Sequence, residues 1–228
     1  LGIMLSTADV GIYSAAQRMV FFLLMFDRVI GTLLLPAATR LHSYSPELLS
    51  ATLSYALRWI LSVALPIALG GTLLADGIIS LVFGAPYAAG GKMFQILVWY
   101  FMLTMVHTIY TSGLVAIRQE KRYSRVMAIS AGVYATTIVV GTNFYGSLGA
   151  VSAVVISELV TMVMMRHEFE KFVKTTLPKS IFAVLFAAAV MCAVLIGFHF
   201  QNVLFAIGGG AFAYLVVLFA ARGVTAAD

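Results

Sequence analysis

Charged residues are scarce in this chain, and that scarcity defines its class. Only 10% of the 228 residues are Asp, Glu, Lys or Arg, whereas 62% are hydrophobic and the mean hydropathy is +1.02. Soluble globular domains carry about 25% charged residues, so this composition excludes an ordinary soluble protein. It predicts an all-α integral membrane protein, built as a polytopic bundle of transmembrane helices.

The sequence also lacks the residue patterns that several kinds of chemistry require. The one cysteine, Cys192, lies in an apolar run, which excludes an internal disulfide and indicates no cysteine-based metal or redox site. The chain has no GxxxxGK[ST] nucleotide loop, no HExxH motif and no paired-cysteine motif. No Ser, His and Asp can be placed together at one depth. We therefore expect a protein that is not an enzyme and that needs neither a cofactor nor a metal.

Long apolar segments predict seven complete membrane spans. A kink or unwinding is expected in the second span at Pro66 and the pair Gly70 and Gly71. Residues 76–91 are expected to form a loop with a short amphiphilic piece. Residues 1–7 resemble the end of an apolar helix and lack an initiator Met, so we expect the natural N-terminus to lie upstream. The predicted spans are residues 9–41, 46–74, 92–116, 124–142, 147–166, 179–198 and 203–221.

Basic residues alternate along the chain in the pattern of the positive-inside rule. They gather in the 40–58, 117–125 and 166–179 segments and at the C-terminus, whereas the intervening connections hold only Lys92. We therefore predict that these three segments and the C-terminus are cytoplasmic. The same distribution explains the net charge of +5 without a nucleic-acid partner.

The first complete span carries charges that a bilayer disfavours. A charged side chain deep in hydrocarbon costs at least ~3 kcal/mol on insertion scales, so it usually faces a bundle interior or an aqueous cavity. Asp27 lies about 180° from Arg18 on a helical wheel, so a partner for Arg18 must come from another helix, from water or from a ligand. Other polar residues lie within about 100° of Arg18 on this wheel: Ser14, Gln17, Arg28, Thr32 and Thr39.

Later spans hold further polar residues. Such residues commonly form hydrogen bonds across packed membrane helices, and for His107 alone this structural role is favoured over proton transport. Glu158 has no charged residue within a helical turn. It is either an ion- or proton-coupling carboxylate or the partner of a basic residue on another helix. Two sets share a helix face: Tyr100, Thr104, His107 and Thr111 in the third span, and Tyr123, Ser130, Tyr134, Thr137 and Gly141 in the fourth.

Three stretches of the chain resemble a transporter family. VGIYSAAQRM followed by VIGTLLLPAATRLH resembles the opening of the C-terminal half of bacterial polysaccharide flippases of the multidrug/oligosaccharidyl-lipid/polysaccharide exporter superfamily. LLADGIISLVFGAPYAAGGKMFQIL and GSLGAVSAVVISELV resemble later parts of that half. The resemblance covers about residues 8–175 and extends loosely to the last helix pair. In the lipid II flippase branch, the arginine that matches Arg18 is a central-cavity residue needed for transport, which implies that role for Arg18.

The resemblance implies a MATE/flippase-like fold of two lobes with about six helices each and the substrate between them. Residues 1–175 would form most of the second lobe with its first helix truncated, and residues 176–228 an accessory transmembrane helix pair. Because alternating access requires an opposing lobe, the N-terminal half of the transporter is an expected partner. Other expected partners are the lipid bilayer and polysaccharide polymerase or assembly proteins. The implied location is the bacterial inner membrane.

The expected function is flipping of polyprenyl-pyrophosphate-linked oligosaccharide for cell-surface polysaccharides such as the O-antigen of lipopolysaccharide. An anionic head group requires an electropositive cleft, and arginine stays charged while binding phosphate oxygens bidentately. One alternative is a cation-coupled multidrug antiporter, which would line its cavity with carboxylates. Another is a membrane-embedded sugar ligase or polymerase, which would need a larger external loop. The candidate residues are Arg18, Gln17, Arg28, Ser14 and Thr32 for substrate binding, and Glu158, Asp27 and His107 for coupling.

Overall fold

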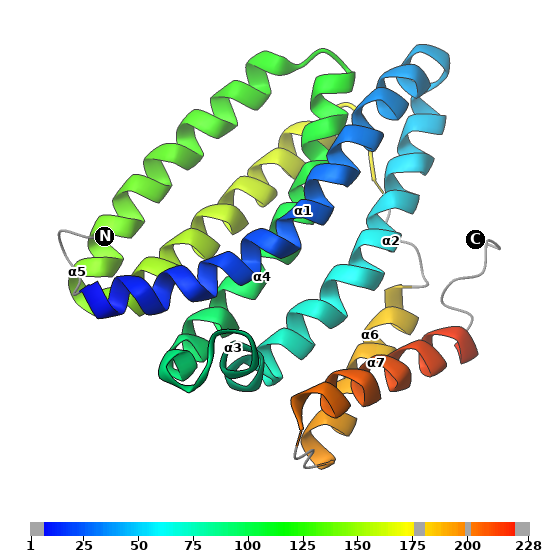
Figure 1. The fold of residues 1–228 in the computed structure, drawn as a ribbon. Helices are drawn as coiled ribbons and strands as arrows, with labels where there is room; N and C mark the ends of the chain where they lie inside the picture. The colour runs from blue at the N-terminus through cyan, green and yellow to red at the C-terminus, as the bar shows by residue number, and fades with distance from the viewer. Residues whose placement is uncertain (1–6, 176–180, 199–201, 222–228) are drawn as a thin grey trace.

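Every regular element in the described chain is a helix. The computed structural model describes residues 7–175, 181–198 and 202–221 (Figure 1). This confirms the predicted all-α fold for that part of the chain. In order, the elements are α1 (Thr7–Tyr44), α2 (Pro46–Leu73), α3 (Ala75–Phe83), the 3-10 helix η1 (Ala85–Gly90), α4 (Gly91–Ala116), α5 (Glu120–Glu170), α6 (Ile181–Gly197) and α7 (Val203–Ala220).

The helices have the lengths that a polytopic membrane bundle requires. Five helical segments are long and apolar enough to cross a bilayer, and α6 is a sixth apolar helix of 17 residues. The 51-residue α5 contains two crossings, because the chain reverses direction at Gly146, where φ is 57° and ψ is −136° (Figure 1). Glycine tolerates this positive φ because it has no Cβ. The described helices therefore match the seven predicted spans.

The predicted loop over residues 76–91 is wrong, because this segment is helical. It forms α3 and η1, which are separated at Gly84, where φ is 89°. Ile79 is fully buried, so α3 packs against the bundle instead of extending into solvent. The sequence pattern was misleading because Gly84 and Pro86 end one helix and begin the next without an extended connection.

The helix α2 continues through Pro66 and the glycine pair to Leu73, so the predicted unwinding is wrong, whereas a kink there stays a prediction. Proline has no N–H, so the carbonyl of Ser62, four residues earlier, loses its helical donor. The hydroxyl of Tyr214 in α7 donates to that carbonyl at 2.7 Å. A buried backbone group is thereby satisfied by tertiary structure, as a membrane interior requires.

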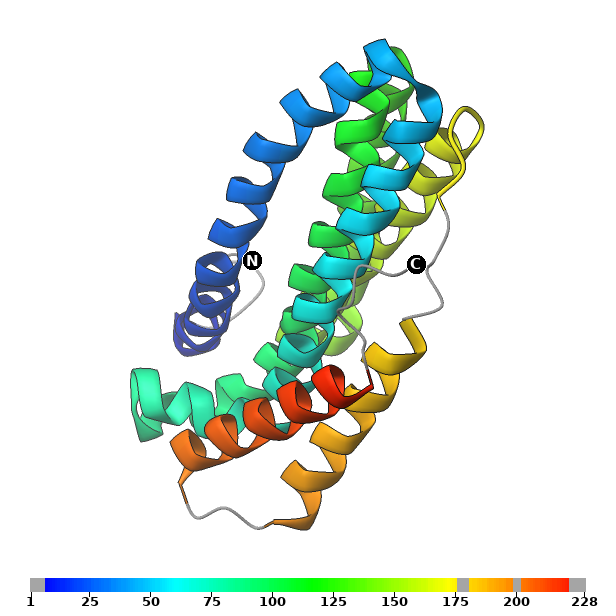
Figure 2. The ribbon, with the colours of Figure 1, turned by 90° about the vertical axis from the view of Figure 1, so that its right-hand side faces the viewer.

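Buried side chains form two separate clusters. In the larger cluster α4 is central and contacts α1, α2, α3 and α5. The smaller one joins α6 and α7 to each other and to Leu65 and Leu69 of α2. Figure 2 shows α6 and α7 as a pair beside the rest of the bundle.

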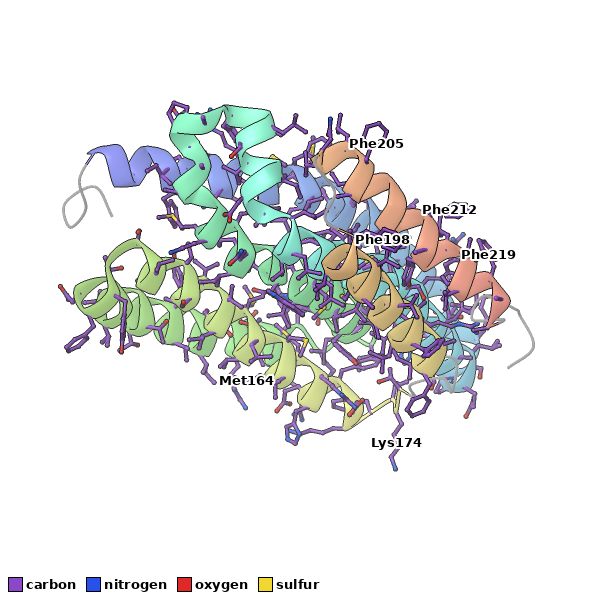
Figure 3. All side chains as sticks on the ribbon, turned by 90° about the horizontal axis from the view of Figure 1, so that it is seen from below. Met164, Lys174, Phe198, Phe205, Phe212 and Phe219 are labelled. Atoms are coloured by element: carbon purple, nitrogen blue, oxygen red, sulfur yellow. The ribbon has the colours of Figure 1, made fainter. Side chains whose placement is uncertain are left out.

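The outer surfaces are apolar, as a bilayer requires. Phe205, Phe212 and Phe219 form a row along the outside of α7 (Figure 3), and each is at least 65% exposed. Their spacing of seven residues places them on one helix face. Among the described helices that are long enough to cross a bilayer, α1 is the most exposed, with only 11% of its most apolar window buried.

The basic segments meet at one end of the bundle. Arg122 at the start of α5 pairs with Glu168 near its end at 2.6 Å. Ser50 in the first turns of α2 donates to the carbonyl of Lys174 at 2.5 Å. Arg58, which the charge pattern assigned to the first basic connection, instead lies inside α2 and is buried. This arrangement agrees with the predicted alternation, whereas the side of the membrane that this end faces stays a prediction.

Some sequence predictions fall on residues outside the described ranges. These are the truncated span at residues 1–6, the connection between the last two spans at residues 199–201, and the basic residues Lys179 and Arg222.

Candidate functional site

Arg18 lies on the exposed face of α1. The large side chains that share this face include Phe22, Met25 and Val29, each more than half exposed. Among the described residues, Arg18 has no hydrogen-bond or ion-pair partner, and the same holds for the exposed Arg28. Both arginines are therefore exposed and available to water or to a ligand.

The other predicted substrate-binding residues on α1 have different surroundings. The Ser14 hydroxyl donates to the carbonyl of Val10 at 2.7 Å, and the Thr32 hydroxyl donates to that of Arg28 at 2.9 Å. These are bonds within the same helix, which leave the oxygen lone pairs as acceptors. Gln17 instead lines a cavity between α1, α4 and α5. The polar residues predicted to share one face of α1 therefore divide between an exposed face and an inner cavity.

Asp27 occupies the opposite face of α1 from Arg18, as the helical wheel predicted. Its carboxylate accepts a hydrogen bond from the Thr108 hydroxyl of α4 at 2.7 Å. It also lies within electrostatic range of His107 and Glu158. Asp27 thus ties α1 to the centre of the bundle.

Glu158 has a basic partner on another helix. Nδ1 of His107 in α4 lies 2.9 Å from Oε1 of Glu158 in α5. Their side chains are only 14% and 12% exposed. This geometry confirms that Glu158 pairs with a basic residue, which was one of its two interpretations, and it does not test ion coupling.

A partly polar cavity of about 320 Å³ reaches Glu158 of this pair. Its walls come from α1, α4 and both halves of α5. Glu158 is its only carboxylate among the described lining residues, and the hydroxyl groups come chiefly from tyrosines. The lining residues are Tyr13, Gln17, Val20, Phe21, Leu97, Tyr100, Tyr134, Val154, Ser157 and Glu158.

The two polar faces predicted for the third and fourth spans gather only partly. Tyr100 and Tyr134 both line the cavity, whereas Thr137 and Gly141 line a different one between the two halves of α5. Ser130 contributes its backbone carbonyl, which accepts from the Ser157 hydroxyl at 3.5 Å. Helical wheels alone could not reveal this division, because it depends on how the two halves of α5 pack with α1 and α4.

Thr108, Tyr13 and Ser157 belong to this region, but the sequence analysis did not single them out. Thr108 directly follows His107, and Tyr13 lies four residues, about one helical turn, before Gln17. Their positions next to candidate residues could therefore have identified both from the sequence. Ser157 directly precedes Glu158. Ser and Thr are so common in membrane helices that such spacing identifies a site only when the facing helix is known.

Together the fold and the site define a class: a polytopic helical membrane protein with an arginine-bearing outer helix and a buried acid and histidine pair. The solved structure of the lipid II flippase MurJ, in an inward closed conformation, shares this fold. The match has a TM-score of 0.79 at 15% sequence identity and covers 94% of this chain and 47% of that chain.

Sequence comparisons agree with that fold. A family model described as polysaccharide biosynthesis protein matches residues 1–90. A probable low-salt glycan biosynthesis flippase, Agl15 of Haloferax volcanii, is 24% identical over 174 residues, which cover 76% of this chain and 37% of that protein. These matches confirm the resemblance to polysaccharide and lipid-linked glycan flippases. The chain spans less than half the length of either protein.

Proposed function

We propose that this chain is the second lobe of a flippase that moves polyprenyl-pyrophosphate-linked oligosaccharide across a membrane for polysaccharide biosynthesis. The observation that carries the proposal is Arg18, an exposed arginine within a helix long enough to span the bilayer, with no partner among the described residues. A permanent cation in that position needs an anion or an aqueous cavity. A pyrophosphate supplies the anion, and the planar guanidinium can bind two of its oxygens at once.

A neighbouring groove supports a substrate with an apolar tail. Its volume is about 680 Å³, and it lies between α1, α2, α4, α6 and α7 with almost entirely apolar walls. Met19 and Phe22 of α1 line it, and they lie one and four residues after Arg18. An amphiphile could therefore place its head group at Arg18 and part of its hydrocarbon chain in the groove.

The two parts of the proposed lobe correspond to the two buried clusters. Residues 1–175 form the lobe that bears Arg18, and residues 176–228 form an accessory pair that completes the apolar groove through α6 and α7. Transport by alternating access requires an opposing lobe, so the working transporter contains further helices. We place this transporter in the bacterial inner membrane, with the C-terminus cytoplasmic and with polysaccharide polymerase or assembly proteins as partners.

The alternatives have less support. A multidrug cation antiporter needs carboxylates free to bind a cation, whereas Glu158 is paired with His107 and Asp27 accepts a hydrogen bond from Thr108. A sugar ligase or polymerase is an enzyme, whereas the two relatives are both named as flippases. We therefore propose transport without catalysis.

The decisive test is substitution of Arg18 in the natural protein. Arg18→Ala should abolish appearance of the lipid-linked oligosaccharide on the far leaflet, and Arg18→Lys should restore it poorly because an ammonium lacks the planar fork. Arg40→Ala is the matched control, since Arg40 is an exposed arginine near the other end of the same helix. Lectin accessibility of the glycan measures transport, and immunoblotting measures abundance. Normal transport by Arg18→Ala would refute the proposal.

A further inference from the structure

The cations at the basic end of the bundle fall into two groups. Arg122 and Lys171 pair with Glu168 at 2.6 and 2.5 Å, and Arg166 pairs with Glu170 at 3.0 Å. The protein itself therefore neutralises these three cations. The connection from α4 to α5 and the first turns of α5 hold three more, all exposed, whose side chains form no hydrogen bond or ion pair in the described part of the chain. They are Arg118, Lys121 and Arg125.

These three unpaired cations lie close together. Lys121 and Arg125 are four residues apart in the first turns of α5, so they share one helix face. Arg118 lies in the tight turn just before them, where its φ is 57°, a left-handed conformation that few residues other than glycine adopt. Glu120 is the one carboxylate within residues 118–125 and forms no ion pair among the described residues. The unpaired cations therefore outnumber the unpaired carboxylate, and their charge remains uncompensated.

The helix face that bears Arg125 continues as an exposed apolar surface. Ile129 and Val139 both lie within about 40° of Arg125 on a helical wheel, and they are 44% and 53% exposed. Val139 is about 21 Å further along the helix, which exceeds the ~15 Å of hydrocarbon in one leaflet. We call Lys121, Arg125, Ile129 and Val139 the α5 strip. It places charge at the end of the bundle and apolar surface further in, the same order as the head group and acyl chain of a lipid.

The first half of α5 lies at the edge of the bundle, as Figure 1 shows. Among the described elements, α5 contacts only α4 and, to a small extent, α1. A free phosphate ion would match the charges of the α5 strip but not its apolar part. A soluble acidic protein would also meet the charges alone, because the apolar part extends along a helix that crosses the bilayer. A lipid with an anionic head group matches both parts.

We propose that Arg118, Lys121 and Arg125 bind the phosphate of an anionic phospholipid, such as phosphatidylglycerol, whose acyl chain lies along the α5 strip. A guanidinium can bind two phosphate oxygens at once, and an ammonium adds a point charge. This lipid site lies on a different helix from Arg18 and does not line the apolar groove. The inference therefore does not rest on the proposed transport function.

A fluorophore beside the α5 strip tests the proposal in the natural protein. Ala128 is exposed and lies about 60° from Arg125 on the helical wheel, so Ala128→Cys in a background without other cysteines places a bimane label there. The protein is reconstituted in membranes in which brominated phosphatidylglycerol or brominated phosphatidylcholine, with the same acyl chains, quenches the label. We expect phosphatidylglycerol to be preferred at least fivefold, the contribution of about one cation at a membrane surface. Equal quenching by the two lipids would refute the site.

Two double variants separate this site from the general charge of the basic end. Lys121→Gln with Arg125→Gln should reduce the preference for phosphatidylglycerol to near one. Arg166→Gln with Lys171→Gln is the matched control, because it removes the same amount of charge from the same end, but from cations that are already paired. The control should keep the preference. Equal losses in both double variants would show that overall charge, and not this site, attracts the lipid.

Arg118→Asn gives an independent test at the connection itself, because asparagine tolerates the positive φ of this position. It should lower the preference for phosphatidylglycerol while the protein stays monodisperse in size-exclusion chromatography. Inorganic phosphate, added at constant ionic strength, should leave the preference of the wild type unchanged. Loss of the preference in phosphate would show that the cations hold a free anion, and an unchanged preference in Arg118→Asn and in the Lys121 and Arg125 double variant would overturn the proposal.

Discussion

The Tyr214 hydroxyl of α7 donates to the Ser62 carbonyl that Pro66 leaves without a helical donor, at 2.7 Å. This contact ties α7 to α2 at a position where the backbone of α2 would otherwise carry an unsatisfied group. Helix α7 therefore satisfies a backbone group of α2.

Tyr214→Phe should lower the free energy of unfolding by about 1–3 kcal/mol, because it leaves the buried carbonyl unpaired. In a Pro66→Ala background the new N–H can donate to Ser62, so Tyr214→Phe should cost much less there. A double-mutant cycle measured by thermal unfolding in detergent tests this. Equal costs in both backgrounds would show that Tyr214 does not compensate for Pro66.

Thr108→Val should destabilise the protein more than Asp27→Asn. The first change keeps the shape of the side chain but leaves a carboxylate without its donor, at a cost of about 1–3 kcal/mol. The second keeps a carbonyl oxygen that can still accept from Thr108. Thr32→Val is the control, because the exposed Thr32 hydroxyl bonds only to carbonyls of its own helix among the described residues. Thermal unfolding of the purified variants gives the order, and the reverse order would contradict this assignment of the hydrogen bond.

Gly149→Ala should prevent the two halves of α5 from packing. A Cβ at Gly149 would lie 1.8 Å from the carbonyl oxygen of Gly141, a backbone atom that cannot move away cheaply. Gly132→Ala is the matched control in the same helix, because a Cβ there meets no described atom within 4 Å. We expect Gly149→Ala to be lost during expression or to aggregate in size-exclusion chromatography, and Gly132→Ala to behave like the wild type. A well-folded Gly149→Ala variant would show that the close contact between Gly149 and Gly141 is wrong.

Stability should depend on pH through Glu168 at the basic end of the bundle. Hydrogen bonds from Lys171 and from Arg122 hold the pKa of the Glu168 carboxyl below its usual range. Because the folded-state pKa is the lower one, this stabilisation is present above the ordinary pKa of about 4.3 and is lost as the pH falls through the folded value. The Glu168→Gln variant should thus unfold at a lower temperature than the wild type at neutral pH. In acid, the two proteins should unfold at the same temperature. A deficit independent of pH would indicate a packing effect instead.

Cysteine labelling tests which side of the membrane the basic end faces. In a Cys192→Ser background of the natural protein, Ser124→Cys should resist an impermeant thiol reagent added to intact cells, because the basic 117–125 segment is predicted to be cytoplasmic. Lys92→Cys at the opposite end should react readily. Both positions are exposed in the structure. The opposite labelling pattern would invert the predicted topology.

Membrane character, helix number and the charged face of α1 follow from sequence alone, because they depend on local composition and on the fixed angle between helical residues. The bounds of α2 and α4 match prediction within one residue for the same reason. The opposite placement of Arg18 and Asp27 also needed only a helical wheel.

Tertiary structure alone decided which helices face one another, and therefore which polar groups are paired. The partnership of His107 with Glu158 joins residues 51 positions apart, and that of Thr108 with Asp27 joins residues 81 apart. No local pattern carries this information, because it depends on how α5 reverses at Gly146 and how α1 crosses α4. The continuity of α2 through Pro66 was hidden for the same physical reason, since the donor that satisfies Ser62 lies in a helix far along the chain.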